Sequence, residues 1–342
     1  MKRISLYFTA PYNVSVREEP LPLPAPDQVL VKTIVSGISP GAEMLVYRGQ
    51  TPTDLLVDEM MANLRGVFSF PLKYGYAAVG RVIAIGVDVD TSWHGRIVFV
   101  CNPHESHFLA APEDLIALPA SLPPEVAVLL PHMETAVSFL MDGQPMIGEQ
   151  VAIFGQGIVG LLTTKLLAQL PLASLITLDR YSLRRELSLK QGAHSSLDPT
   201  LPNALSHLRE LLQGNRPYAG ADLTYELSGN PEALDQAIQT TGFNGRILVG
   251  SWYGQKRADL NLGGYFHRSH MSLISSQVNQ IAPRWLGRWN KGRRLQIVWS
   301  MLQKYAPATL ITHRFPITRA KQAYQLLDWN PGDAIQVIFT YE

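Results

Sequence analysis

The chain has 342 residues, of which 46% are hydrophobic and 17% charged, and its formal net charge is +1. This balance excludes a disordered chain and gives no sign of a nucleic-acid or membrane-surface partner. The single cysteine, Cys101, excludes an internal disulfide and any zinc site built from four cysteines. No segment has the roughly 20 uninterrupted apolar residues of a membrane span, so we predict a soluble, cytoplasmic protein of about two domains.

Residues 1–123 are predicted to form a β-rich domain. Segments 28–35, 80–86 and 95–100 are rich in β-branched and apolar residues typical of strands. The prolines at positions 20, 22, 24 and 26 form a connector, because a central strand does not accept proline. Residues 55–64 could form a helix. Short strands separated by Gly and Pro indicate a small barrel or sandwich.

From residue 124 onward, predicted strands alternate with predicted helices. This alternation predicts a doubly wound parallel sheet over 124–280 with right-handed crossovers. The segment 281–304 is predicted to be a basic helix that contains tryptophans. Residues 334–341 resemble a strand. The whole region 281–342 is expected to return to the first domain. The last sheet strand could pair edge to edge in a homodimer. The predicted strands are 151–154, 174–178, 222–226, 246–250 and 271–275, and the predicted helices are 125–141, 158–170, 181–191, 203–213 and 231–240.

Three glycines after the apolar run at 151–154 form a dinucleotide-binding pattern. Gly155 permits a tight turn, Gly157 lets the backbone approach a pyrophosphate, and Gly160 lets the helix pack on the strand. The N–H groups at the start of the helix are available to the phosphates. A Gly-rich turn in another α/β fold is the alternative. The predicted phosphate-binding residues are Gly155, Gln156, Gly157, Ile158, Val159 and Gly160.

The second predicted strand of this unit ends in Asp179, about 20 residues after the glycines, where an acid accepts hydrogen bonds from the adenosine ribose. An acid here repels a 2′-phosphate and favours NAD. The nearby Arg180, Arg184 and Arg185 favour NADP, because arginine can hold that phosphate; we predict NAD, with NADP as the alternative. Ser228, Gly250 and Ser251 follow later strands at their carboxyl ends and are predicted to bind the cofactor too.

Several segments resemble the medium-chain dehydrogenase/reductase superfamily, the alcohol dehydrogenase-like proteins. They are Ser36-Gly-Ile-Ser-Pro-Gly-Ala-Glu43, Gly75-Tyr-Ala-Ala-Val-Gly80 and Leu129-Leu-Pro-His-Met-Glu-Thr-Ala136. The resemblance covers nearly the whole chain and implies an α/β fold with a Rossmann doubly wound parallel sheet and a β-rich GroES-like catalytic domain. Within the superfamily, the chain resembles the zinc-free branch that includes the bacteriochlorophyllide hydroxyethyl dehydrogenases.

The chain departs from the zinc-dependent members at the implied metal positions. Ser39 stands at the position of the family cysteine, Tyr76 at that of the histidine and Ala77 at that of the glutamate, while the third ligand position falls near Pro131 or His132. Neutral Ser and Tyr oxygens do not replace a thiolate and an imidazole as zinc ligands, so we predict no zinc. The four-cysteine lobe of the family is expected to be absent, because 101–107 contains one cysteine.

A zinc-free enzyme of this kind needs another group to polarise the carbonyl. The resemblance implies Tyr76 or His132 as the proton donor, with Ser39 as a helper and Thr135 beside the nicotinamide. Packing roles are the alternative for Tyr76 and His132. Glu134 is predicted to be a solvated helix residue, with orientation of His132 as the alternative. Glu43 resembles a family acid that pairs with a buried arginine.

Two further groups of side chains could bind a ligand, although a structural role is favoured for each. His104 and His107 could be a metal pair, but their spacing does not favour it. The basic segment 284–294 could bind an acidic substrate tail, but a solvated helix face with packed tryptophans is favoured.

We therefore predict a zinc-independent, NAD(P)-dependent oxidoreductase that interconverts a secondary alcohol and a ketone on a bulky organic small molecule, such as a tetrapyrrole or a pterin. An NADPH-dependent quinone or enoyl reductase is the first alternative, because it uses the same fold without metal. A nucleotide-binding protein without turnover is the second.

Overall fold

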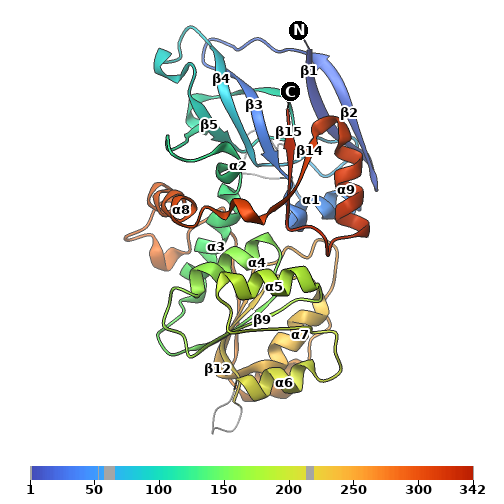
Figure 1. The fold of residues 1–342 in the computed structure, drawn as a ribbon, viewed down its shortest axis with the longest axis vertical. Coiled ribbons are helices and arrows are strands. Elements are labelled where there is room, and N and C mark those ends of the chain that lie inside the picture. Colours follow the sequence, from blue (N-terminus) through green and yellow to red (C-terminus); the bar gives the residue numbers. More distant parts are fainter. Residues whose placement is uncertain (1, 53, 58–65, 213–218, 342) are drawn as a thin grey trace. The chain divides into compact units, whose positions relative to one another are not determined.

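The computed structural model describes residues 2–52, 54–57, 66–212 and 219–341. The chain divides into two compact units (Figure 1): unit 1 comprises Met1–Pro131 and Trp299–Glu342, and unit 2 comprises His132–Val298. This division differs from the predicted boundaries at 123 and 280. Unit 2 starts after residue 131, inside a helix, and it also includes 281–298.

Unit 1 is a β-rich unit, and the end of the chain completes it. β1 (Lys2–Ala10) pairs with β2 (Asn13–Pro20), and a second sheet has the strand order β14-β15-β3-β4-β5-β7, with β6 paired to β3. The predicted strand segments 28–35, 80–86 and 95–100 correspond to β3, β4 and β5. The tail strand β15 lies between β14 and β3, so its predicted return to the first domain is confirmed. The bounds are β3 (Val29–Gly37), β4 (Ala78–Ile85), β5 (Ile97–Val100), β6 (His107–Ala110), β7 (Ile116–Ala117), β14 (Ile311–Pro316) and β15 (Gln336–Thr340).

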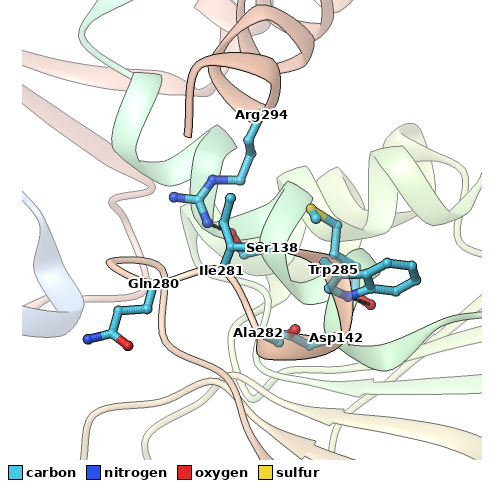
Figure 2. A pocket seen from close by; sticks show the side chains of 8 residues that line it. Ser138, Asp142, Gln280, Ile281, Ala282, Trp285 and Arg294 are labelled. Carbon is cyan, nitrogen blue, oxygen red and sulfur yellow. Dashed lines mark hydrogen bonds between the residues drawn. The ribbon is translucent and has the colours of Figure 1, made fainter. Parts of the chain in front are cut away.

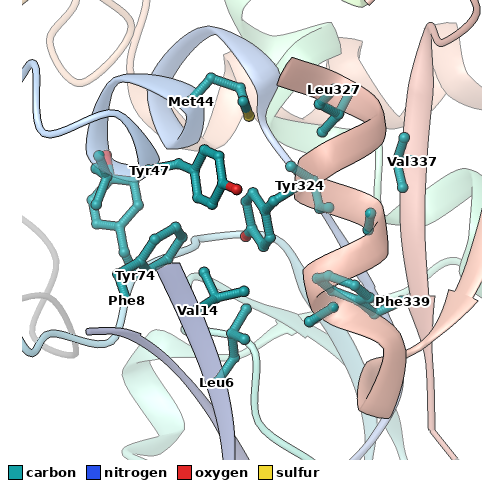
Figure 3. Close-up of a cluster of buried hydrophobic side chains, with 14 of the residues drawn as sticks. Leu6, Phe8, Val14, Met44, Tyr47, Tyr74, Tyr324, Leu327, Val337 and Phe339 are labelled. Atoms are coloured by element: carbon teal, nitrogen blue, oxygen red, sulfur yellow. The ribbon is translucent and has the colours of Figure 1, made fainter. Parts of the chain in front are cut away.

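Helices α1 (Pro40–Tyr47) and α9 (Ala320–Trp329) share a buried aromatic core with these strands (Figure 3). The rings of Tyr47 and Tyr324 are stacked with their centroids 5.3 Å apart, and Phe8 meets Tyr324 edge-on at 5.1 Å. Buried aromatic pairs of this geometry contribute about 0.5–1.5 kcal/mol beyond their area. The core therefore joins the first 50 residues of the chain to the last 25. The helix predicted at 55–64 lies mostly outside the described residues.

Unit 2 contains a parallel sheet with the strand order β10-β9-β8-β11-β12-β13. In order along the chain this is the 3-2-1-4-5-6 arrangement of a doubly wound dinucleotide-binding sheet. The predicted strands all appear, whereas β10 was missed because a three-residue strand has too little periodicity to detect. The bounds are β8 (Gln150–Phe154), β9 (Ser174–Leu178), β10 (Ser195–Leu197), β11 (Ala221–Glu226), β12 (Thr241–Val249) and β13 (Ser272–Ser275).

Helices cover both faces of this sheet because its strands are apolar on both sides. One face packs Phe154 against Leu208 and Leu234 from α6 and α7, and the other packs Ile153 against Phe139 and Leu167 from α3 and α4. The two-domain α/β prediction is thereby confirmed. The helices are α3 (Leu130–Gly143), α4 (Ile158–Leu167), α5 (Ser182–Gln191), α6 (Ala204–Leu211) and α7 (Pro231–Thr240).

Two predicted helices are shorter than expected. The segment 125–141 is split into α2 (Pro124–Ala127) and α3, because Pro131 has no N–H with which to continue the hydrogen-bond ladder. The segment 281–304 begins with a short 3-10 turn at Pro283–Trp285, and α8 (Lys291–Tyr305) starts only after Asn290. The Oδ1 atom of Asn290 accepts the Arg293 N–H at 2.8 Å and so fixes this start. No helix in the described ranges is long and apolar enough to cross a membrane.

Candidate functional site

The glycine-rich turn lies where the strand order of unit 2 reverses, between β8 and β11. Gly155 follows β8 with φ +94°, a backbone conformation that disfavours any side chain. Its N–H donates to Leu178 O at 2.8 Å, and Leu227 N–H donates to Phe154 O at 2.8 Å, so the turns after β8, β9 and β11 are joined. Ligands of open α/β sheets bind at this reversal, at the carboxyl ends of the strands.

The three glycines differ in the space around them. A Cβ on Gly155 would lie 2.6 Å from the Ser228 backbone, and a Cβ on Gly160 would lie 2.1 Å from Gly155 O. Both positions therefore need glycine for close packing. A Cβ on Gly157 would meet nothing within 4 Å, which leaves open space at the first turn of α4. This space fits a pyrophosphate approaching the helix N-terminus, although cofactor binding by Gly155, Gln156, Gly157, Ile158, Val159 and Gly160 stays a prediction.

Asp179 follows β9 and braces this turn. Its Oδ2 accepts the Gln156 N–H at 2.7 Å, and its Oδ1 accepts the Tyr181 N–H at 2.9 Å. Its side chain is nearly buried, and the Arg184 guanidinium lies 3.8 Å from Oδ2. A ribose at this position would share the carboxylate with these backbone groups.

The arginines after Asp179 have different surroundings. Arg185 donates to Asp179 O at 2.8 Å and pairs with Asp198 at 3.1 Å, so that acid already neutralises it. The guanidinium groups of Arg180 and Arg184 lie 5.1 and 4.8 Å from the centre of the Tyr181 ring. Arg180 and Arg184 therefore lie against Tyr181, two residues after Asp179, whereas Arg185 is engaged in the fold.

Sequence reasoning missed Glu226, the last residue of β11. Its carboxylate is fully buried, and its Oε1 accepts the Ser228 N–H at 2.8 Å and the Gly229 N–H at 3.1 Å. Tyr253 donates to Oε2 at 2.6 Å, and burial together with this carboxylate raises the pKa of Tyr253, so the phenol stays protonated. Ser251 Oγ accepts the Gly229 N–H at 2.9 Å. One buried acid thus orders the loops that carry Ser228, Gly250 and Ser251.

We expect Glu226→Gln to weaken NADH binding by about five- to thirtyfold, because it removes charge-assisted hydrogen bonds worth roughly 1–2 kcal/mol. Titration of protein fluorescence with NADH measures this change. Tyr253→Phe removes only one donor and should have a smaller effect. If Glu226→Gln lowers the melting temperature but leaves the NADH dissociation constant unchanged, Glu226 supports the fold and not the cofactor loops.

In unit 1 the structure brings Ser39 and Tyr76 together. Ser39 immediately precedes α1, and Tyr76 lies two residues before the start of β4. The hydroxyl groups of Ser39 and Tyr76 are hydrogen-bonded to each other. The Ser39 N–H also donates to Glu43 Oε1 at 2.7 Å, which fixes the start of the helix. The two side chains that the resemblance placed at implied metal positions are therefore in contact within one unit, and their catalytic role stays a prediction.

A buried polar chain lies behind this pair. Glu43 Oε2 contacts His104 Nε2 at 3.0 Å and accepts the Tyr324 hydroxyl at 2.6 Å. His104 Nδ1 contacts Ser36 Oγ at 2.7 Å, and Ser36 Oγ lies 2.6 Å from the Tyr341 hydroxyl. Glu43 thus pairs with a histidine, not with the arginine that the resemblance implied.

His104 is committed to this chain and His107 contacts Ser106 Oγ at 3.1 Å. Across the described residues no group of three His, Cys, Asp or Glu side chains could hold a metal ion. The segment 101–107 lies against the β-rich unit instead of forming a lobe, since Glu105 accepts a bond from Lys73 at 2.5 Å and Ser106 N–H donates to Ile4 O at 2.8 Å.

His132 and Thr135 belong to α3 in unit 2, and His132 is buried. The roles of His132 as proton donor and of Thr135 beside the nicotinamide stay predictions. The prediction of a solvated Glu134 is wrong: its Oε1 accepts two bonds from Arg294, at 2.9 and 3.1 Å. Arg294 is only 2% exposed, so the favoured solvated face for 284–294 does not hold at this residue. The sequence alone does not show which of the cations in 284–294 is buried and which are exposed.

Comparison with known proteins gives several dehydrogenases among the relatives and the solved structures. No family model matches the chain. The L-threonine 3-dehydrogenase of Pyrococcus horikoshii is 26% identical over 292 residues, which cover 76% of this chain and 79% of the relative. An alcohol dehydrogenase of E. coli CFT073 in complex with NADH has a TM-score of 0.80 at 18% identity and covers 99% of both chains. A zinc-binding dehydrogenase of Sinorhizobium meliloti bound to NADP has a TM-score of 0.77 at 18% identity and covers 99% of both chains.

These likenesses extend over both units, and they agree with the strand order and the glycine-rich turn described above. By its fold, the chain resembles these solved dehydrogenases, with a β-rich unit and a unit built on a doubly wound parallel sheet.

Proposed function

We propose that the protein is an NAD(P)-dependent oxidoreductase that interconverts a secondary alcohol and a ketone. The observation that carries this proposal is the Gly155–Gly160 turn, which closes on Ser228 but leaves the space at Gly157 open at the reversal of the strand order. A dinucleotide bound there supplies a hydride acceptor or donor. The L-threonine 3-dehydrogenase relative supports a dehydrogenase acting at a hydroxyl-bearing carbon.

We infer that the reaction is zinc-independent, although solved structures of the same fold include zinc-binding dehydrogenases. The residues at the implied metal positions do not fit zinc, because the Ser39 and Tyr76 hydroxyls are neutral and bond to each other. In this proposal Tyr76 donates the proton that a ketone oxygen gains on reduction, and Ser39 orients the phenol. His132 is the alternative donor.

For the cofactor we propose NAD. The nearly buried Asp179 carboxylate lies at the end of β9, where a 2′-phosphate would meet its negative charge. Arg180 and Arg184 on Tyr181 are the observation that favours NADP instead. Thermal melting with NAD and with NADP ranks the two, because a ligand of the native state raises the melting temperature.

The substrate proposal remains a bulky organic small molecule of tetrapyrrole or pterin type. The runner-up activity, quinone or enoyl reduction, would also use the Tyr76 hydroxyl, because reduction of C=C needs a proton donor. NADH and NADPH oxidation with a panel of ketones and a panel of quinones and enones separates the two. Tight NADH binding with no turnover in either panel would favour a silent nucleotide-binding protein and would contradict the enzyme proposal.

The absence of catalytic zinc has a direct test. We expect metal analysis of purified, active protein to find well under one zinc per chain, with turnover unchanged after dialysis against a chelator. One tightly held zinc per chain, together with chelator-sensitive turnover, would contradict the zinc-independent proposal.

We also propose a homodimer that forms through β13, which is the last strand of the sheet and has Leu273 39% exposed. Light scattering on the purified protein measures the mass, and Leu273→Lys should convert a dimer into a monomer if this edge is the interface.

A further inference from the structure

One long stretch of the chain is free of acidic residues. No Asp or Glu lies between Asp259 and Asp328, although the whole chain has 28 acidic and 29 basic residues. Within this stretch, we call residues 283–294 the basic ridge. It comprises the 3-10 turn at Pro283–Trp285, the loop up to Asn290 and the first turn of α8. Its cations are Arg284, Arg288, Lys291, Arg293 and Arg294.

Only one of these cations is neutralised within the described part of the chain. Arg294 is buried and binds Glu134, and it also donates to Ser138 Oγ at 3.1 Å and Val278 O at 2.7 Å. Among the described residues, no carboxylate lies within 4.0 Å of the other four cations of the ridge. These four side chains are exposed, so the ridge has uncompensated positive charge.

Tryptophan rings hold two of the exposed guanidinium groups in place. Arg288 lies 4.9 Å from the centre of the Trp285 ring, and Arg293 lies 4.3 Å from that of Trp289. Arg293 also donates to Arg288 O at 2.6 Å. A guanidinium stacked by its face on a ring keeps the N–H groups of its edge available, and these bind carboxylate or phosphate in pairs. Arg288 and Arg293 are therefore held in place with N–H groups available to an oxyanion.

The ridge is fixed to α3. Trp285 Nε1 donates to Met141 O at 3.1 Å, and Arg294 reaches Glu134 and Ser138 one to two turns earlier on the same helix. Figure 2 shows Arg294, Ser138, Asp142 and Trp285 around a small hollow. Its accessible volume of about 10 Å³ is far below the roughly 300–1,000 Å³ of a ligand pocket, so the hollow anchors the ridge and is not itself a substrate site.

The position of the ridge connects it to the predicted cofactor residues of unit 2. It follows β13, whose neighbour β12 ends at Val249, just before Gly250 and Ser251. The helix that anchors the ridge carries Thr135, next to Glu134. The ridge is thus bonded to α3, and in the chain it follows the carboxyl end of β13. Ligands bind at the carboxyl ends of the strands in such folds.

We propose that the basic ridge binds a carboxylate or phosphate group of the substrate, so that the protein acts on an anionic alcohol or ketone. This inference rests on the proposed dehydrogenase function and names its substrate class. A single-stranded nucleic acid fits less well, because guanidinium groups already cover the tryptophan faces on which bases would stack.

The first test measures binding without turnover. Citrate and inorganic pyrophosphate are titrated into the NAD-saturated protein at constant ionic strength, and tryptophan fluorescence reports occupancy beside Trp285 and Trp289. We expect saturable binding that weakens at least about tenfold in Arg288→Gln/Arg293→Gln. The control Arg268→Gln/Lys304→Gln removes the same charge from exposed positions of the acid-free stretch and should bind within about twofold of wild type. A preference for citrate or for pyrophosphate distinguishes the two oxyanions.

The second test measures selectivity in turnover with levulinate and its methyl ester, a ketone with and without a charge. We expect kcat/KM to favour the acid in the wild type and this preference to fall about tenfold in the ridge variant, with ester reduction unchanged. Absence of saturable anion binding, or equal loss in the control variant, would overturn the proposal. Binding only to phosphatidylglycerol vesicles would overturn it in favour of a membrane surface. If anions bind at the ridge but no carbonyl panel is reduced, the dehydrogenase proposal fails while the anion site stands.

Discussion

The variant Gly157→Ala is expected to fold nearly as stably as the wild type and yet bind NADH about tenfold or more weakly. Its Cβ would meet no protein atom within 4 Å, and its φ of −68° suits any residue. The added methyl group would instead occupy the open space that we assign to the pyrophosphate. Thermal melting measures the first half of this expectation and fluorescence titration with NADH the second.

Gly160→Ala is the matched variant with the opposite expectation. Its Cβ would lie 2.1 Å from Gly155 O, so the helix or the turn must shift, at a cost of about 1–3 kcal/mol in folding stability. A clear fall in melting temperature should accompany any loss of binding. If Gly157→Ala binds NADH as the wild type does, the phosphates do not approach at Gly157 and the proposed cofactor position is wrong.

Tyr76→Phe should lower kcat by about 10²- to 10⁴-fold while leaving the NADH dissociation constant unchanged, because it removes the proposed proton donor and nothing from unit 2. Ser39→Ala should cost less, since it removes only the partner that orients the phenol. Steady-state rates with the best ketone of the panel, together with NADH titration, measure both effects.

Two further variants make this expectation decisive. Tyr74→Phe removes a buried hydroxyl from the same segment, without the bond to Ser39, and should keep most of the activity. His132→Asn tests the alternative donor. A larger loss of kcat in His132→Asn than in Tyr76→Phe would transfer the donor role to His132, and wild-type rates in Tyr76→Phe would remove the tyrosine from the chemistry.

Strong local patterns made the parallel sheet predictable. The strand at 151–154, its three glycines and Asp179 all lie within the single stretch 151–179, and each has one dominant physical role. The start of α8 was not predictable to the residue, because 281–290 has the composition of a helix but forms a 3-10 turn and a loop before the Asn290 cap. The break before α3 could have been found, since Pro131 interrupts the helical pattern.

Partners that are distant in sequence account for what sequence reasoning missed at the candidate site. Glu43 meets His104 and Tyr324, which are 61 and 281 residues away. Glu134 meets Arg294, which is 160 residues away. Such pairs depend on tertiary packing, and a single sequence has no periodicity that records them. Glu226 had a local signal: it is an acid at the carboxyl end of the predicted strand 222–226, two residues before the predicted Ser228.

The position of β15 in the first sheet affects the order in which the two units can fold during translation. Unit 2 is one continuous stretch, His132–Val298, and can collapse as soon as that stretch has emerged. The first sheet cannot be completed before β15 has been synthesised, because β3 pairs with β15, with Ile338 opposite Gly37, and Ser36 bonds to Tyr341. Until then, β3 has an unpaired edge that a chaperone or another nascent chain can occupy.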